Sequence, residues 1–200
     1  MNPVRFALAG FGAWGKFHAQ SIAGNPDAAL IAITAPSEAS REEARKLYPE
    51  AQIFADSLEM IAKADFDIID IATPSHTHRE IALAAMQKGK HVLLEKPMAI
   101  TLDDCKAIVA GARDHGVHLA VGHELRLSSQ WGRIKDIIAA GTIGDPQYVL
   151  VELLRKPYRT GASGWRYDQS RVGSWVLEEP IHFFDLARWY LEGSGDPVEL

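Results

Sequence analysis

Short apolar runs alternate with amphipathic segments along the first 123 residues of the chain. The runs that predict strands are VRFALAG, ALIAITA, FDIIDIATP, KHVLLEKP and VHLAVGH. The segments with helical periodicity are WGKFHAQSIAG, SREEARKLY, HREIALAAMQKG (with Gly89 expected at its C-cap) and LDDCKAIVAGARDHG. Apolar strands joined by helices are typical of a parallel sheet covered on both faces. The pattern therefore predicts a doubly wound α/β domain over residues 1–123.

The pattern changes from residue 124 onward. The segment SSQWGRIKDIIAAGTIG predicts a helix, PQYVLVELL predicts a strand, and residues 180–191 predict a final helix. An unpaired strand leaves its backbone polar groups without partners, so these elements cannot form a sheet domain alone. We therefore expect residues 124–200 to be the first, incomplete portion of a second domain, with the missing strands supplied by a longer chain or by a partner subunit.

Composition and charge narrow the function classes. The 21 basic and 26 acidic residues give a net charge of −5, and no basic patch or charged tail is present, which argues against a nucleic-acid partner. No apolar run reaches the ~20 residues of a membrane span. One cysteine, Cys105, excludes a disulfide within the chain and fits a reducing compartment. We expect a cytoplasmic protein with a small-molecule ligand.

Three glycines follow the first predicted strand and open the first predicted helix. The spacing is Gly10-x-Gly12-x-x-Gly15, with Ala13 and Trp14 inside the loop. In a dinucleotide-binding loop the first glycine permits a tight turn, the second lets a pyrophosphate approach the backbone, and the third lets helix and strand pack closely. A purely structural turn is the alternative. The strand–turn–helix context favours dinucleotide binding and a Rossmann fold.

The end of the second predicted strand bears on the choice of coenzyme. An acidic residue there favours NAD, but this chain has no carboxylate before Glu38. Ser37 and Arg41 are placed to hold the 2′-phosphate of NADP instead, although Arg41 is equally typical of a solvated helix face. The sequence predicts NAD or NADP as cofactor and favours NADP.

Three later strand ends deliver polar residues to the edge where the glycine loop lies. Thr73 and Pro74 follow the third predicted strand, Glu95 and Lys96 the fourth, and Glu124 the fifth. Ligands of parallel sheets bind outside the carboxyl ends of the strands. We therefore assign the first four residues to the cofactor, and Lys96 and Glu124 to the substrate. A lysine in such a crevice can donate hydrogen bonds, whereas most lysines serve solubility.

Histidines raise two further possibilities. His78 in SHTH is expected at the mouth of the cofactor site or at the start of a helix, and a metal is not predicted because no third ligand accompanies His76 and His78. His182 lies in EEPIHFFDLARW, four residues after Glu178. A histidine beside a carboxylate is a suitable proton acceptor near neutral pH. The alternative for His182 is a helix-capping or core histidine.

Taken together, these motifs resemble those of the Gfo/Idh/MocA family of NAD(P)-dependent oxidoreductases. The matching segments are GFGAWG, ATPSHTH, ALAAMQKGKHVLLEKPMA, AAGTIGDPQYV, GWRYD and HFFDLARWYLEG. The resemblance implies that Lys96 is the active-site lysine and His182 the acid–base histidine. Glu178 and Pro180 stand where family members usually carry aspartate and glycine. It also implies that Arg126, Trp165 and Arg166 line the substrate pocket.

The resemblance also implies a second domain with a mostly antiparallel open sheet and a homo-oligomeric assembly. The expected activity is hydride transfer between NAD(P) and a hydroxyl or carbonyl carbon of a sugar, cyclitol or related polyol. A non-catalytic NAD(P)-binding regulator and an NAD-dependent glycoside hydrolase with internal redox recycling are the alternatives.

Overall fold

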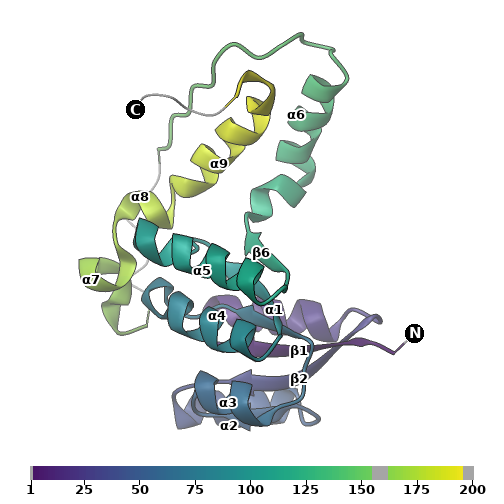
Figure 1. The fold of residues 1–200 in the computed structure, drawn as a ribbon, viewed down its shortest axis with the longest axis vertical. Coiled ribbons are helices and arrows are strands. Elements are labelled where there is room, and N and C mark those ends of the chain that lie inside the picture. Colours follow the sequence, from purple (N-terminus) through teal and green to yellow (C-terminus); the bar gives the residue numbers. More distant parts are fainter. Residues whose placement is uncertain (1, 155–161, 196–200) are drawn as a thin grey trace. The chain divides into compact units, whose positions relative to one another are not determined.

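The computed structural model describes residues 2–154 and 162–195, and its first 122 residues build a six-stranded parallel sheet (Figure 1). The strands are β1 (Val4–Ala9), β2 (Ala28–Thr34), β3 (Gln52–Phe54), β4 (Ile68–Ile71), β5 (His91–Glu95) and β6 (Leu119–Gly122). Their order is β3-β2-β1-β4-β5-β6, with every pair parallel. This is the strand order of a Rossmann fold, and it confirms the predicted fold class.

Two helix layers cover the sheet. On one face α1 (Ala13–Ala23) and α2 (Glu38–Leu47) share a buried cluster that contains Leu8 and Ile33. On the other face α3 (Ser57–Lys63), α4 (His78–Gln87) and α5 (Leu102–Asp114) share a larger cluster that contains Ile69, Leu94 and Ile108. Alternate residues of each strand therefore enter opposite layers, as the side-chain period of two requires.

Strand β3 and helix α3 were not predicted from the sequence. Strand β3 has three residues and α3 has seven, so neither is long enough to show a periodic pattern. The start of α3 is nevertheless marked, because the Asp56 side chain accepts a hydrogen bond from the Glu59 N–H. Ser37 and Thr101 cap α2 and α5 in the same way. Gly89 follows α4 with φ of 69°, as expected of a glycine at a helix end.

The order of the strands reverses between β1 and β4. From β1 the chain proceeds through α1 and α2 toward β3, and from β4 it proceeds through α4 and α5 toward β6. The loops that follow β1 and β4 therefore diverge to opposite faces, which leaves a crevice outside their carboxyl ends. Gly10 and Ala72 are the first residues of these two loops.

Close backbone contact fixes α1 against this crevice. Gly10 has φ of 100°, and a Cβ there would lie 2.7 Å from the Ala72 carbonyl oxygen. A Cβ on Gly15 would lie 1.9 Å from the Gly10 carbonyl oxygen. The two positions therefore require glycine for reasons of space, and at Gly10 also for backbone conformation. Both roles agree with those predicted from the glycine spacing.

The chain divides into two compact units. The first comprises the described residues 2–122 and 162–173, and the second comprises 123–154 and 174–195. Residues 162–173, with the 3₁₀ helix η3 (Ala162–Tyr167) and α7 (Gln169–Val172), therefore belong with the sheet. Short 3₁₀ helices also follow β4 (η1, Ser75–Thr77) and β6 (η2, Glu124–Leu127).

The second unit is helical as described. It contains α6 (Ser129–Ala139), α8 (Trp175–Glu178), α9 (Ile181–Tyr190) and the 3₁₀ helix η4 (Glu192–Ser194). The Tyr190 hydroxyl donates to the Trp131 carbonyl and so ties α9 to α6. The predicted helices over 128–144 and 180–191 are confirmed, with ends a few residues shorter in the first case.

The strand predicted for PQYVLVELL is wrong for this structure. Residues 146–154 form no ladder, and Tyr148, Leu150 and Leu154 are 81%, 76% and 96% exposed. The described part of the second unit holds no strand with which they could pair. A strand requires a partner for its backbone groups, and an apolar alternating pattern alone does not supply one.

Gly15→Ala should destabilise the fold while Gly12→Ala should not. The added Cβ at position 15 overlaps backbone, so we expect a loss of at least about 2 kcal/mol in the free energy of unfolding, at the upper side of overpacking costs. At position 12 nothing lies within 4 Å of the added Cβ, so the change should stay below about 1 kcal/mol. Urea denaturation of both variants measures the difference, and equal stabilities would contradict the close-contact argument.

Candidate functional site

The glycine loop leaves the start of α1 open. Gly12 is the N-cap residue of α1, and it has no side chain to accept a hydrogen bond from the first turn. A Cβ built on Gly12 meets nothing within 4 Å. The free N–H groups of a helix start and the positive end of its dipole favour a phosphate. Ala13 and Trp14 form the first turn, so their backbone lies at the same opening.

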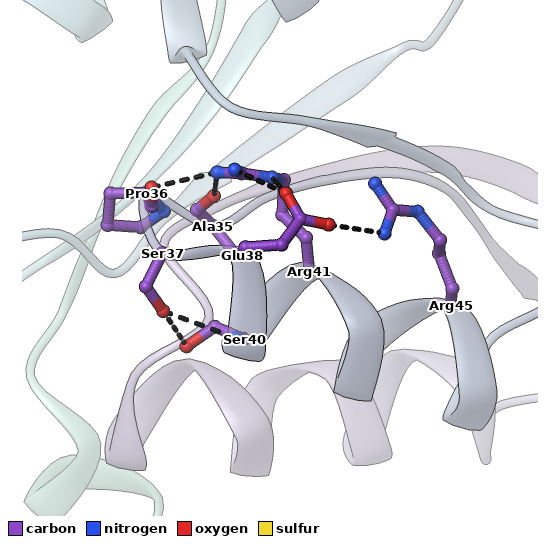
Figure 2. Close-up of polar contacts among 7 residues, drawn as sticks. All are labelled: Ala35, Pro36, Ser37, Glu38, Ser40, Arg41 and Arg45. Carbon is purple, nitrogen blue, oxygen red and sulfur yellow. Dashed lines mark hydrogen bonds and ion pairs between the residues drawn. The ribbon is translucent and has the colours of Figure 1, made fainter.

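At the end of β2, two arginines hold the only carboxylate of the turn (Figure 2). Glu38 accepts hydrogen bonds from Arg41 Nη2 at 2.6 Å and from Arg45 Nη1 at 2.8 Å. Hydrogen bonds from Arg45, and then from Arg41, lower the pKa of Glu38. Arg41 Nη1 also donates to the carbonyl oxygens of Ala35 and Pro36 at 2.9 and 2.8 Å. The Arg41 guanidinium is therefore held across the turn where an adenosine ribose is bound in this fold class.

Two hydroxyl groups of the same turn are hydrogen-bonded to each other. The Ser37 hydroxyl donates to Ser40 Oγ at 2.8 Å and accepts from the Ser40 N–H at 3.2 Å (Figure 2). With two guanidinium groups and one carboxylate, the charge of the cluster formed by Glu38, Arg41 and Arg45 is 2 − 1 = +1. A cluster of this kind is suited to a phosphate more than to an uncharged diol.

His78 joins the loops that follow β4 and β5. It is the first residue of α4 and is 1% exposed. Its Nε2 lies 2.9 Å from the Thr73 carbonyl oxygen and its Nδ1 3.0 Å from that of Pro97. The Thr73 hydroxyl in turn lies 2.7 Å from that of Thr77. Burial lowers the pKa of His78. The buried His78 side chain thus contacts the backbone of Thr73 and Pro97, and its expected contact with the cofactor stays a prediction.

Glu95 and Lys96 end the fifth strand at the same edge of the sheet. Glu95 is the last residue of β5, and Lys96 begins the turn that continues through a cis peptide bond to Pro97. Burial acts to raise the pKa of Glu95, but hydrogen bonds from His18 and Trp14 and the charge of Lys96 outweigh it and lower the pKa. An ionised Glu95 therefore stands directly before Lys96, both at the carboxyl edge of the sheet.

In the second unit, His182 lies beside Glu124, a carboxylate that we assigned to the substrate from the sequence. His182 lies in the first turn of α9 with its side chain 9% exposed, and its Nδ1 is 3.5 Å from Glu124 Oε2 on η2. Glu178, the acid expected to act on His182, is 3% exposed at the end of α8. Sequence separation hid the Glu124 contact, because the two positions are 58 residues apart along the chain.

Arg126 is held by a residue that the sequence analysis did not name as functional. Its Nε and Nη2 donate to Asp185 Oδ2 and Oδ1 at 2.7 and 2.6 Å. The guanidinium also lies 5.4 Å from the centroid of the Trp189 ring. His123 Nδ1 lies 3.8 Å from Asp185 Oδ2. Arg126 and Asp185 line a pocket of about 330 Å³. The segment 123–127 and α9 therefore gather three of the predicted residues, His182, Glu124 and Arg126, within the second unit.

The remaining predicted substrate residues belong to the first unit. Trp165 and Arg166 lie on η3, and the Arg166 guanidinium lies 5.1 Å from the Trp165 ring centroid. Lys96 lies in the first unit and His182 in the second. Among the described residues, no group of three His, Cys, Asp or Glu side chains could hold a metal ion, and no helix has the length and apolarity needed to cross a membrane.

Comparison with known proteins identifies the family of the chain. Residues 4–123 match the model of an oxidoreductase family with an NAD-binding Rossmann fold, GFO/IDH/MocA, and residues 131–200 match the model of a GFO/IDH/MocA C-terminal domain. The chain belongs to the GFO/IDH/MocA family. The family's NAD-binding Rossmann domain thus corresponds to the sheet and the glycine loop described above.

This GFO/IDH/MocA chain is similar to proteins that are named as a reductase or as inositol dehydrogenases. It is 36% identical over 143 residues to 1,5-anhydro-D-fructose reductase of Ensifer adhaerens, covering 70% of this chain and 42% of that protein. It is 32% identical over 199 residues to inositol 2-dehydrogenase 1 of Saccharopolyspora erythraea, and this match covers 96% of this chain and 55% of that protein. The structure of scyllo-inositol dehydrogenase from Lactobacillus casei with bound NAD(H) and scyllo-inositol matches with a TM-score of 0.82 at 26% identity, covering 96% and 57%. The chain spans about half the length of the relatives it matches.

Gly12→Ala should weaken coenzyme binding without unfolding the protein. The new methyl group would occupy the open space over the loop, where a diphosphate approaches the backbone. We expect the Kd for NADPH and NADH to rise at least about tenfold, equivalent to ~1.4 kcal/mol. Fluorescence titration of the reduced coenzymes measures this, and an unchanged Kd in a folded variant would contradict the assigned role of the loop.

Proposed function

We propose that the protein is a dehydrogenase that transfers hydride between NAD(P) and a hydroxyl or carbonyl carbon of a sugar, cyclitol or related polyol. One observation carries the proposal. The open glycine loop after β1 and Lys96 after β5 lie at the same carboxyl edge of one sheet, on opposite sides of the point where strand order reverses. The names of the reductase and the inositol dehydrogenases that the chain resembles support the substrate class.

The residues of the chain supply the proton and charge chemistry of this reaction. Bound NAD(P)⁺ supplies the hydride acceptor. His182 takes the proton of the substrate hydroxyl as hydride leaves the same carbon, and Glu124, 3.5 Å from its Nδ1, stabilises the imidazolium that results. Lys96 donates a hydrogen bond to the developing oxyanion. Glu178 is assigned to orienting His182 from the preceding helix. The reverse reaction, reduction of the carbonyl, uses the same groups.

The turn after β2 supports NADP as the preferred coenzyme. A carboxylate that bonds the ribose hydroxyls selects NAD, but Glu38 already accepts from Arg41 and Arg45. The cluster keeps one net positive charge, and Ser37 directly precedes Glu38 in the same turn. A 2′-phosphate would add negative charge at this place and gain from the arginines.

Lys96→Met and His182→Ala should each abolish turnover while coenzyme still binds. Loss of an oxyanion donor lowers kcat by about 10²–10³, and loss of a general base lowers it by about 10²–10⁴. Nicotinamide absorbance with a panel of sugars and cyclitols measures kcat, and fluorescence titration measures coenzyme Kd. Lys88→Met, at an exposed position after α4, is the matched control for charge removal. Near-normal turnover in both active-site variants would contradict the proposal.

The same assay separates the other two functions. A net change in nicotinamide absorbance indicates a dehydrogenase. Sugar cleavage without net absorbance change indicates a glycoside hydrolase that recycles its coenzyme, and binding without either indicates a regulator. The proposed function requires the first result with at least one polyol.

Arg41→Ala should change coenzyme preference. Removing the guanidinium leaves Glu38 with one arginine partner and lowers the net charge of the cluster to zero, so we expect the Kd for NADPH to rise at least about tenfold relative to that for NADH. Lys46→Ala removes the same charge from an exposed position of the same helix and should leave the ratio unchanged. Equal ratios in the wild type and in Arg41→Ala would contradict the preference for NADP.

A further inference from the structure

A histidine on α1 bridges two acids on adjacent strands. His18 Nδ1 lies 2.7 Å from Asp70 Oδ2 on β4, and His18 Nε2 lies 3.2 Å from Glu95 Oε1 on β5. The side chains of His18, Asp70 and Glu95 are 19%, 2% and 12% exposed. Neither of the two contacts follows from sequence proximity, since α1, β4 and β5 are separate elements. Each ring nitrogen of His18 therefore faces one carboxyl group, Nδ1 that of Asp70 and Nε2 that of Glu95.

His18, Asp70 and Glu95 form a largely buried cluster of ionisable side chains. Burial disfavours the charged ring, but hydrogen bonds and charges from Asp70 and Glu95 outweigh it and raise the pKa of His18 from 6.5 to about 10. Both ring nitrogens can then donate at neutral pH. Asp70 Oδ1 is buried and has no hydrogen-bond partner among the described residues, so His18 is the group that compensates this carboxylate. Burial and the charge of Glu95 raise the pKa of Asp70 in spite of His18, and Lys96 acts on the cluster through Glu95.

A second residue of the same helix acts on Glu95. Interaction with the Trp14 side chain helps to lower the pKa of Glu95, and Trp14 lies in the first turn of α1, inside the glycine loop. Glu95 directly precedes Lys96. The helix whose start is open for a phosphate is therefore joined by His18 to the residue that directly precedes Lys96, and Trp14 of the same helix also acts on that residue.

We propose that His18 is a positioning residue, whose bridge between Asp70 and Glu95 fixes the turn of Glu95, Lys96 and Pro97 relative to the glycine-loop helix. This inference rests on the proposed function only for what Lys96 does chemically. A core histidine that merely fills space needs no acid on either nitrogen, and here both nitrogens face one. When the cation is removed, two buried carboxylates lose their common partner and the turn is free to move.

His18→Gln, His18→Lys and His115→Gln test this role. Glutamine removes the cation at similar size, lysine restores a cation, and His115 is an exposed histidine at the end of α5 that serves as matched control. In His18→Gln we expect kcat to fall about 10²-fold, the effect of a misplacement near 1 Å, with a much smaller change in coenzyme Kd. Lysine should recover most of kcat, and His115→Gln should equal the wild type. Unchanged kcat in His18→Gln, or equal losses in His18→Gln and His18→Lys, would overturn the proposal.

Two readouts do not depend on turnover. Hydrogen exchange of the peptide that covers residues 91–98 should accelerate in His18→Gln and recover in His18→Lys. Because His18 has a raised pKa in the folded state, the stability advantage of wild type over His18→Gln should be full below about pH 6.5 and should be lost as pH rises toward 10. Unchanged hydrogen exchange, or a stability advantage independent of pH, would overturn the proposed role of His18.

A wild-type protein that oxidises no polyol would contradict the proposed function, and the two readouts would then still test the role of His18. If His18→Gln is too unstable to purify, exchange in His18→Lys and wild type as a function of pH gives the same decision.

Discussion

The contact between the backbone of Gly15 and the Gly10 carbonyl is the constraint on which the rest of the site depends. A Cβ at Gly15 would lie 1.9 Å from that oxygen, so no other residue lets α1 approach β1 this closely. The contact places the start of α1 at the carboxyl end of β1, beside the point where strand order reverses. The N-terminal end of the helix dipole then faces the crevice, and on our proposal this is where the diphosphate of the coenzyme meets the N–H groups of the first turn.

The chain has a net charge of −5, but Glu38 and Glu95 at this edge are paired with cationic side chains. The pairing reduces the repulsion that an anionic ligand would meet there. Glu38 is engaged by Arg41 and Arg45, and Glu95 by His18 with Lys96 nearby. Uncompensated carboxylates at these places would repel phosphate groups. Each pair also holds a loop in place: the first holds the turn after β2, and the second, on our proposal, holds the turn that carries Lys96. The same interactions thus serve both charge balance and geometry.

Much of the first unit could be predicted from local sequence. Most of the features that could not be predicted depend on contacts between segments that are far apart along the chain. Strands β1, β2, β4, β5 and β6 have continuous apolar runs, and Gly10 and Gly15 occur at the spacing their contacts require, so both could be predicted. The strand predicted over 146–154 failed because a pattern specifies apolar positions but not a partner for the backbone. Asp185 and the pairing of His182 with Glu124 could not be found from spacing, since they join segments about 60 residues apart. His18 had a local signal, its place on the helix behind the glycine loop, but its two acids come from β4 and β5 and are visible only in three dimensions.

A crystal structure of the protein with NADP⁺ and a polyol bound tests the central claim most directly. We expect the diphosphate against the backbone of Gly12 at the start of α1 and the nicotinamide ring beside Lys96. The reacting carbon of the polyol should lie within reach of both Lys96 and His182. A coenzyme that binds away from the glycine loop, or a polyol out of reach of the Lys96 amine, would contradict it.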